Sequence, residues 1–202
     1  MTHQWSQATD ATGAAVKVAL FDYRKAFDLI DHNLLDTKIL GLYIPRSVAG
    51  WVLDFLTDLK RVKLPADCLS EWGPVPAGLP QGTRLSPWLF LLMISDLKVD
   101  ALTWKYVDDT TIAEIIPRNT VGDVQTAISA VEAWLQANRM ELNTDKCKGM
   151  IIDFKKNTHN FSPLVINGQE LPISNSVKIL CLSICANLKW NEHILKRIKK
   201  AN

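Results

Sequence analysis

Two runs of strand-forming residues, Thr103 to Val107 and Thr110 to Ile116, flank the adjacent acids Asp108-Asp109. Such runs joined by a short turn predict a β-hairpin with the acids at or beside the turn. A third acid, Asp22, follows the apolar run Val16 to Phe21, which is typical of a buried strand. We therefore expect the sheet to bring three carboxylates together.

Three gathered carboxylates have a specific chemistry. Adjacent acids repel each other, so a crowded pair needs a cation or a proton. Carboxylates are the ligands that Mg²⁺ prefers, and two such ions roughly 3.5–4 Å apart can activate a hydroxyl and stabilise a leaving group. The alternative is ordinary: acids at an exposed hairpin tip are solvated turn residues, and an aspartate after a strand is often a turn residue or helix cap.

The rest of the chain mixes helices and strands. Apolar residues at helical spacing predict helices over Arg24 to Leu40, Arg46 to Leu59, Ser86 to Leu97, Val124 to Leu135 and Trp190 to Lys200. Strands are predicted over Arg61 to Leu64, Trp72 to Val75, Met150 to Phe154, Leu164 to Ile166 and Val177 to Ile184, with a hairpin turn at Asn167-Gly168. This order indicates a mixed α+β domain and not a regular βαβ alternation.

Composition adds bounds. The 202 residues are 48% hydrophobic and 22% charged, as in a globular domain with a real core. A formal charge of +2 is too small to predict nucleic-acid binding by itself. Four cysteines without a CxxC pair favour reduced thiols over a zinc site or disulfides. The sequence has no apolar core of a signal peptide and no apolar run long enough to span a bilayer, so we expect a soluble intracellular protein of the cytoplasm or nucleus. Residues 1–15 are predicted to form a flexible segment.

Five motifs in order resemble those of reverse transcriptases, with the flavour of non-LTR retrotransposons. The first three palm motifs are matched by Phe21 to Asp28, Gly78 to Thr83 and Tyr106 to Asp109. Two segments, Leu29 to His32 and Pro87 to Phe90, are typical of the non-LTR branch. The fourth motif is matched by Asn143 to Lys146, and the fifth is matched by Lys178 to Leu180 with Leu188 to Trp190, His193 and Ile194. The resemblance implies a polymerase palm over residues 16–186, an antiparallel sheet with helices packed on one face. Residues 187–202 would form a basic helix at the start of a thumb.

The resemblance also implies roles for single residues. Asp22, Asp108 and Asp109 would be catalytic and, with the Tyr23 carbonyl, would hold two Mg²⁺ ions, for which Mn²⁺ can substitute. The nucleotide would be bound by Phe27 beneath its sugar, by Gln81, Gly82 and Lys146, and by backbone N–H groups of Arg24, Lys25 and Ala26 at a helix N-terminus. Nucleic acid would be bound by Lys189, Lys196, Arg197, Lys199 and Lys200. The implied partners are an RNA template, a DNA primer and deoxynucleoside triphosphates, without a membrane.

Ordinary roles compete with several of these assignments. Periodicity alone favours Phe27 as a core aromatic, and Lys146 is equally typical of a solvated surface lysine. The terminal basic residues are also consistent with a solvated helix face. Two positions depart from the family pattern: Ser86 and Cys181 stand where glycine is usual.

The chain begins just before the first motif, so we expect the fingers to be largely missing and the thumb to be truncated. A second chain could then be a partner that supplies the fingers or the thumb. The alternative is a catalytically inactive retroelement remnant that at most binds nucleic acid. A viral-type RNA polymerase is disfavoured by Phe27, since an aromatic ring leaves no room for a 2′-hydroxyl. An unrelated α+β domain would have to match five ordered motifs by accident.

Overall fold

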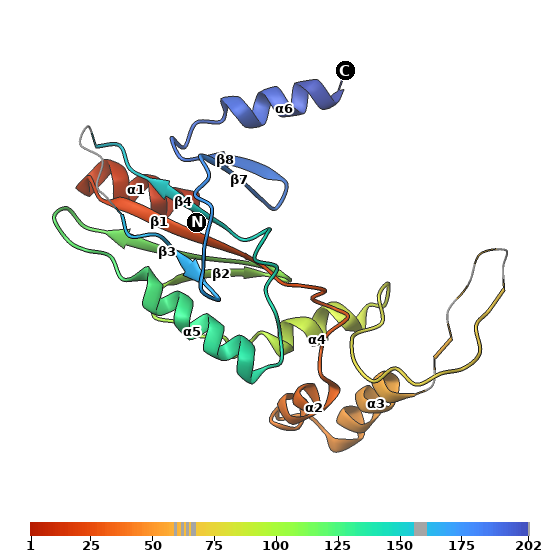
Figure 1. The fold of residues 1–202 in the computed structure, drawn as a ribbon. Helices are drawn as coiled ribbons and strands as arrows, with labels where there is room; N and C mark the ends of the chain where they lie inside the picture. The colour runs from red at the N-terminus through yellow and green to blue at the C-terminus, as the bar shows by residue number, and fades with distance from the viewer. Residues whose placement is uncertain (59, 62, 64, 66–67, 156–160, 202) are drawn as a thin grey trace. The chain divides into compact units, whose positions relative to one another are not determined.

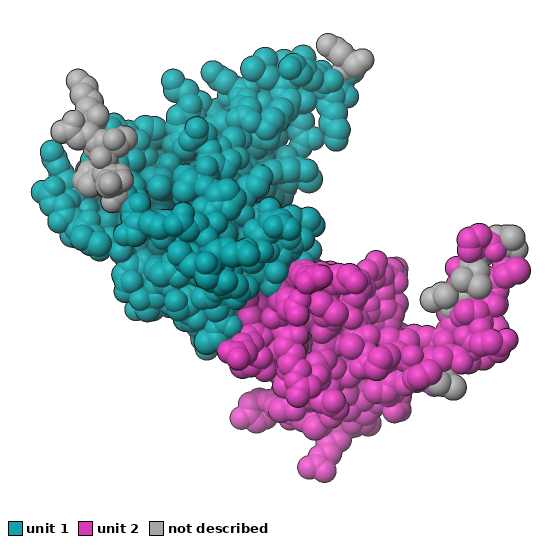
Figure 2. Space-filling model, in the orientation of Figure 1, with its two compact units in different colours: residues 1–23, 98–134, 142–202 teal, residues 24–97, 135–141 magenta. Residues whose placement is uncertain are grey.

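The computed structural model describes every residue except 59, 62, 64, 66–67, 156–160 and 202 (Figure 1). The chain forms two compact units, each built from segments that are separate in sequence. Unit 1 contains residues 1–23, 98–134 and 142–202, and unit 2 contains residues 24–97 and 135–141 (Figure 2). Within the described residues, no helix is both long and apolar enough to cross a membrane.

Unit 1 is built on a four-stranded antiparallel sheet in the order β2-β3-β1-β4. The strands are β1 (Ala15–Asp22), β2 (Leu102–Tyr106), β3 (Asp109–Ile116) and β4 (Lys148–Ile152). β1 lies in the centre because its residues are almost all buried, as the apolar run predicts. The predicted hairpin around the acids is confirmed, since β2 and β3 pair from Leu102↔Ala113 to Tyr106↔Asp109.

The N-terminal residues 1–15 are not the flexible segment that their polar composition predicts. They contain helix α1 (Thr2–Thr12) and the start of β1. Trp5 is fully buried in the core cluster with Val16, Val18 and Met150, and its ring meets Trp104 edge to face at 5.9 Å. One large buried aromatic ring thus holds a mostly polar helix against the sheet.

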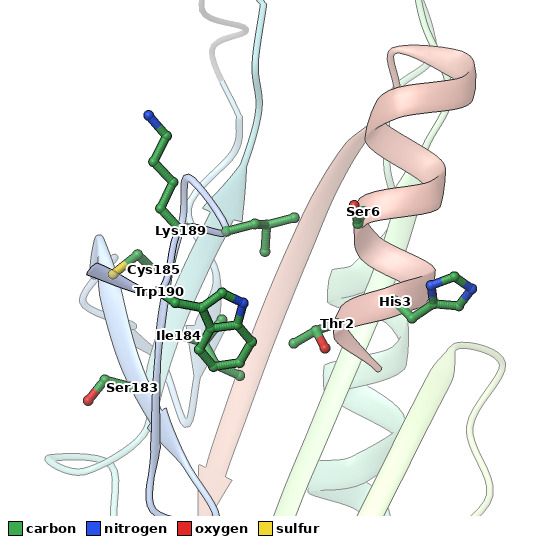
Figure 3. Close-up of a pocket in the computed structure, with 9 residues that line it drawn as sticks. Thr2, His3, Ser6, Ser183, Ile184, Cys185, Lys189 and Trp190 are labelled. Atoms are coloured by element: carbon green, nitrogen blue, oxygen red, sulfur yellow. The ribbon is translucent and has the colours of Figure 1, made fainter. Parts of the chain in front are cut away.

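A cavity of about 230 Å³ lies between α1 and the segment that leads into the last helix. Figure 3 shows Thr2, His3 and Ser6 on α1 on one side, with Ile184 and Trp190 on the other. It is separate from the predicted acidic site, because none of the three acids lines it.

The C-terminal part of unit 1 is made of hairpins and two helices. α5 (Val124–Ala137), which begins in unit 1, is as predicted, and β5 (Val165–Ile166) pairs with β6 (Gln169–Glu170). Asn167 and Gly168 both have positive φ, as the predicted hairpin turn requires. The single strand predicted over Val177 to Ile184 is wrong: β7 (Ser176–Ile179) and β8 (Leu182–Cys185) form a hairpin. α6 (Asn191–Ala201) follows, with no buried residue.

Unit 2 contains three further helices, α2 (His32–Leu40), α3 (Arg46–Thr57) and α4 (Leu85–Met93). The helix predicted over Arg24 to Leu40 is correct only from His32 onward. Asp31 ends the preceding turns and caps α2, its carboxylate accepting hydrogen bonds from the N–H groups of Asn33 and Leu34. α4 is also shorter than predicted, because the chain turns at Ile94.

The segment between α3 and α4 is mostly irregular. The strands predicted at Arg61 to Leu64 and Trp72 to Val75 reduce to isolated bridges such as Lys60↔Gly73, and parts of the first lie outside the described residues. Gly78 has a φ of +91°, and a Cβ atom there would lie 2.7 Å from the Asp28 carbonyl oxygen. Glycine is therefore required where the second motif approaches the first.

Candidate active site

The sheet register brings two of the three predicted acids directly together. β1 ends at Asp22 and β3 begins at Asp109, and these two residues are paired across the sheet. Asp108 precedes Asp109 in the two-residue turn between β2 and β3. All three belong to unit 1, so the fold of that unit alone supplies the carboxylates.

The turn that carries Asp108 has a strained backbone. Val107, its first residue, has a φ of +52°, a conformation that β-branched residues rarely adopt. Such strain is held only where the surrounding structure over-determines it, and here the paired strands on both sides do so. The turn fixes Asp108 at the end of the sheet next to the Asp22↔Asp109 pair.

The electrostatics of the acids show that they act on one another. Partial burial raises the pKa of Asp109, and the charges of Asp108 and then Asp22 raise it further. Asp108 and Asp109 are exposed and Asp22 is half-buried, so solvent weakens the repulsion without removing it. A cation placed among the three would relieve that repulsion.

Tyr23 is tied into the sheet beside the acids. Its hydroxyl shares a hydrogen bond of 3.2 Å with Thr110 Oγ1, and burial raises the pKa of the phenol. Its main chain bridges to Leu142. The ring is therefore a packing element, and only the carbonyl of Tyr23 is a candidate ligand.

Lys146 reaches the acids from the turn before β4. Its Nζ lies 3.6 Å from Asp22 Oδ1, with both side chains more than a third exposed. An ammonium group at this distance is a weak ion pair in solvent. It nevertheless places one positive charge at the mouth of the acidic site, where a cavity of about 320 Å³ is lined by Asp22, Asp109 and Lys146 among other residues.

The donor set fits a hard divalent cation, although the side chains are not arranged around one. Across the described residues, no three histidine, cysteine, aspartate or glutamate side chains lie close enough together to hold a metal ion as they stand. Asp22, Asp108 and Asp109 are carboxylates with mutual repulsion, which is the chemistry that Mg²⁺ or Mn²⁺ satisfies.

The residues predicted to contact the triphosphate lie in unit 2 and differ from expectation. Arg24, Lys25 and Ala26 are not at a helix N-terminus, because residues 24–29 form turns in which Lys25 has a φ of +46°. The Arg24 N–H already donates to the Glu141 carbonyl at 2.8 Å. The prediction that these three N–H groups open a helix is wrong, and that of Arg24 is engaged elsewhere.

The other predicted nucleotide-contacting residues of unit 2 are held by local contacts. Phe27 is half-buried and stacks on Phe90, with ring centroids 4.9 Å apart and planes at 22°. Gln81 donates from Nε2 to Asp28 Oδ1 at 3.1 Å, and Gly82 has a φ of +82°. Stacking on Phe90 fixes the orientation of the Phe27 ring, while part of the residue remains accessible to solvent.

The terminal basic residues divide into engaged and outward-facing groups. The Lys196 ammonium pairs with Glu192, and the Arg197 guanidinium donates to the Cys181 carbonyl at 2.9 Å. Hydrogen bonds from Cys185, Lys196 and Ser176 lower the pKa of Glu192 to about 2. Lys189, Lys199 and Lys200 are exposed, and no residue of α6 is buried.

The two departures from the family pattern have different structural consequences. The Ser86 side chain is buried and its hydroxyl donates to the Pro80 carbonyl at 2.6 Å, so serine ties the loop of the second motif together. Cys181 has a φ of +67°, and its neighbour Leu180 has a φ of +46°. Glycine is favoured in such a turn, and cysteine there is strained.

Sequence reasoning missed Cys147. Its side chain is fully buried, and its Sγ accepts a hydrogen bond of 3.4 Å from the Asp22 N–H. The signal was its position directly after Lys146, at the end of the fourth motif, but a cysteine between two lysines forms no local pattern that marks it as a contact of Asp22.

Comparisons with known proteins agree with this geometry. Residues 1–184 match the family model described as reverse transcriptase (RNA-dependent DNA polymerase). The chain belongs to the reverse transcriptase family. The resemblance expected from the motifs is thereby confirmed, and with it membership of a family of nucleotidyltransferases.

Its relatives are polymerases of mobile elements. The chain is 26% identical over 189 residues to the RNA-directed DNA polymerase from mobile element jockey of Drosophila melanogaster, covering 87% of this chain and 20% of that protein. It is 24% identical to a probable RNA-directed DNA polymerase from transposon BS of the same organism, covering 86% and 20%. The chain thus spans about a fifth of the length of these relatives.

Solved structures show the fold. Apo telomerase from Candida tropicalis, truncated from its C-terminal domain, matches with a TM-score of 0.61 and 16% identity over 93% of this chain and 37% of that one. Telomerase from Candida albicans, in complex with a fragment of telomeric RNA, matches with a TM-score of 0.57 and 15% identity, covering 91% and 31%. The predicted α+β polymerase palm is confirmed.

Proposed function

We propose that this chain is the palm of an RNA-directed DNA polymerase that transfers deoxynucleotides to a primer 3′-hydroxyl on an RNA template. One observation carries the proposal: β1 and β3 pair Asp22 with Asp109, and the turn before β3 adds Asp108 beside them. In a reverse transcriptase, that arrangement has an immediate use, because nucleotidyl transfer needs carboxylates that hold divalent cations.

The three acids and the Tyr23 carbonyl would hold two Mg²⁺ ions, with Mn²⁺ as a substitute. When bound, such ions activate the primer hydroxyl and stabilise the leaving pyrophosphate. Burial first, and then the charges of Asp108 and Asp22, raise the pKa of Asp109; the charge repulsion supports this assignment, since a bound cation would offset it.

The remaining roles belong to other residues of the palm. The primer 3′-oxygen forms a bond to the α-phosphorus while the bond to the β-phosphate oxygen breaks, so negative charge grows on the pyrophosphate. Lys146, close to Asp22, offers a positive charge or a proton to that leaving group. Phe27 excludes a 2′-hydroxyl, and Gln81 and Gly82 contact the incoming nucleotide.

Nucleic acid would be bound by the exposed cations around α6, of which Lys189, Lys199 and Lys200 project into solvent. The partners are then an RNA template, a DNA primer and deoxynucleoside triphosphates. A second chain that supplies fingers or thumb belongs to the same proposal. The competing function is a silent retroelement remnant, favoured by the strained Cys181 in the hairpin that would grip the primer.

The test is extension of a labelled DNA primer on an RNA template with Mg²⁺ or Mn²⁺, using protein shown to melt cooperatively. Addition of deoxynucleotides supports the proposal. Equal addition of ribonucleotides would favour an RNA polymerase and remove the role of Phe27. No extension by folded protein, under conditions where an added full-length reverse transcriptase works, would favour the silent remnant.

A further inference from the structure

The ladder between β1 and β4 is interrupted beside Asp22. Its last regular pair is Leu20↔Lys148, and pairing resumes only at the isolated bridge Tyr23↔Leu142. Between these two points, Phe21 and Asp22 face the five residues 143–147, which form a turn. Irregular pairing of this kind re-aims side chains and is common next to active sites.

Contacts with two residues, Asn143 and Cys147, hold the Asp22 main chain inside this interruption. The Asp22 carbonyl accepts a hydrogen bond of 2.8 Å from the Asn143 N–H. The Asp22 N–H donates to Cys147 Sγ at 3.4 Å. The Asn143 carbonyl accepts from the N–H groups of Lys146 and Cys147, at 3.0 and 3.1 Å, and so closes the turn on itself. Asp22 is therefore held in place through both its N–H and its carbonyl group.

We propose that Cys147 is a positioning residue that fixes Asp22 for metal binding; this rests on the proposed function. The thiol takes the place of the carbonyl that would accept the Asp22 N–H if the ladder continued. Without the thiol, that N–H loses its acceptor within the sheet, and Asp22 keeps only its contact with Asn143. Residues that orient metal ligands typically change metal affinity by about 10- to 100-fold when they are removed.

The competing role for Cys147 is simple packing, because its side chain is fully buried. Three substitutions separate the two roles. Cys147→Ala removes both the acceptor and volume, Cys147→Val fills the space without an acceptor, and Cys147→Ser restores an acceptor. A positioning role predicts that alanine and valine behave alike and that serine rescues. A packing role predicts that serine is no better than alanine.

The first readout is amide hydrogen exchange at Asp22, followed by NMR without any metal. In the parent chain we expect a protected Asp22 amide. In Cys147→Ala and Cys147→Val it should exchange at least about tenfold faster, while the amides of Val16 to Leu20 stay protected. Cys147→Ser should restore the protection. Cys185→Ala, the same change at a thiol that contacts Glu192, is the control and should leave Asp22 unaffected.

The second readout is Mn²⁺ affinity, measured from the electron paramagnetic resonance signal of the free ion. Cys147→Ala should bind Mn²⁺ about tenfold more weakly than the parent, and Cys147→Ser should recover most of the loss. An unchanged Asp22 amide, or equal Mn²⁺ affinity in Cys147→Ala and Cys185→Ala, would overturn the proposal. A parent that binds no Mn²⁺ would count against the proposed metal site and, with it, the role of Cys147 there. Asp22 exchange would then show whether the failure lies in the metal site or in the thiol contact.

Discussion

At the scale of single residues, the acidic site is a balance of charges. Partial burial raises the pKa of Asp109, and the negative charges of Asp108 and Asp22 raise it further. Lys146 supplies a positive charge 3.6 Å from Asp22. A lysine that partly neutralises the acids also competes with any ion that binds them.

Lys146→Ala should therefore tighten Mn²⁺ binding while it slows nucleotide addition. Both side chains are more than a third exposed, so we expect only a gain in affinity of about two- to fivefold, in the range of a surface ion pair. Lys146→Arg keeps the charge and should bind Mn²⁺ as the parent does. Isothermal titration of each variant checks the affinity, and weaker binding by the alanine variant would contradict the competition.

The raised pKa of Asp109 predicts that the stability of the metal-free fold depends on pH. Its pKa in the folded chain is raised above its unfolded value of 3.8, so the folded state binds more protons between the two pKa values. Stability then falls as pH rises through that interval, because the fold favours the protonated form. Asp109→Asn should melt at a higher temperature than the parent at pH 7, and the difference should vanish near pH 3. A lower melting temperature at pH 7 would refute this sign.

At the scale of elements, the acidic hairpin was predictable because both of its strands are rich in β-formers and end at polar residues. The start of α2 was not, since the apolar spacing from Phe27 continues smoothly through the Asp31 cap that ends the turns. The β7–β8 turn was missed for a related reason. Its two positive-φ positions carry Leu180 and Cys181, so the usual glycine signal is absent.

Cys181→Gly should stabilise the β7–β8 hairpin. Glycine adopts the left-handed conformation without strain, which stabilises the folded state by roughly 1–2 kcal/mol. Glycine also makes the unfolded chain more flexible, which destabilises the fold by roughly 0.5–1 kcal/mol. We expect a net gain of about 0.5–1 kcal/mol in the free energy of unfolding by urea. Lys178→Gly, at an exposed strand position of β7, is the control and should be destabilising. A loss of stability in Cys181→Gly would show that the turn is not strained.

The exposed cations of α6 predict how binding to an RNA–DNA hybrid depends on salt. Each phosphate contact adds close to one to the slope of log K against log salt concentration. The double variant Lys199→Ala/Lys200→Ala should reduce that slope by about 2. Lys98→Ala, an exposed lysine of another segment, should leave it unchanged. Fluorescence anisotropy over a salt series decides, and an unaltered slope in the double variant would remove α6 from the interface.

At the scale of the whole molecule, the chain forms two units, each built from segments that are separate in sequence. Local sequence patterns do not predict this division. The order of the motifs along the chain predicted the three acids as a set, and the pairing of β1 with β3 places Asp22 opposite Asp109. Their catalytic role is part of the proposed function. The motifs did not identify Cys147, whose role depends on where the β1–β4 ladder breaks. The prediction that Arg24 to Ala26 begin a helix was wrong because the conformation of this turn depends on contacts with distant residues, such as the hydrogen bond from the Arg24 N–H to the Glu141 carbonyl. A local sequence pattern does not contain such contacts.

The most direct measurement is single-nucleotide addition to a DNA primer on an RNA template, compared between the parent, Asp108→Asn and Asp100→Asn. Asp100 is an exposed acid of the same unit outside the proposed site, so it controls for loss of charge. We predict addition by the parent and by Asp100→Asn, and loss of at least about 100-fold in Asp108→Asn, as expected when a group that stabilises the transition state is removed. Undiminished addition by Asp108→Asn would contradict the account.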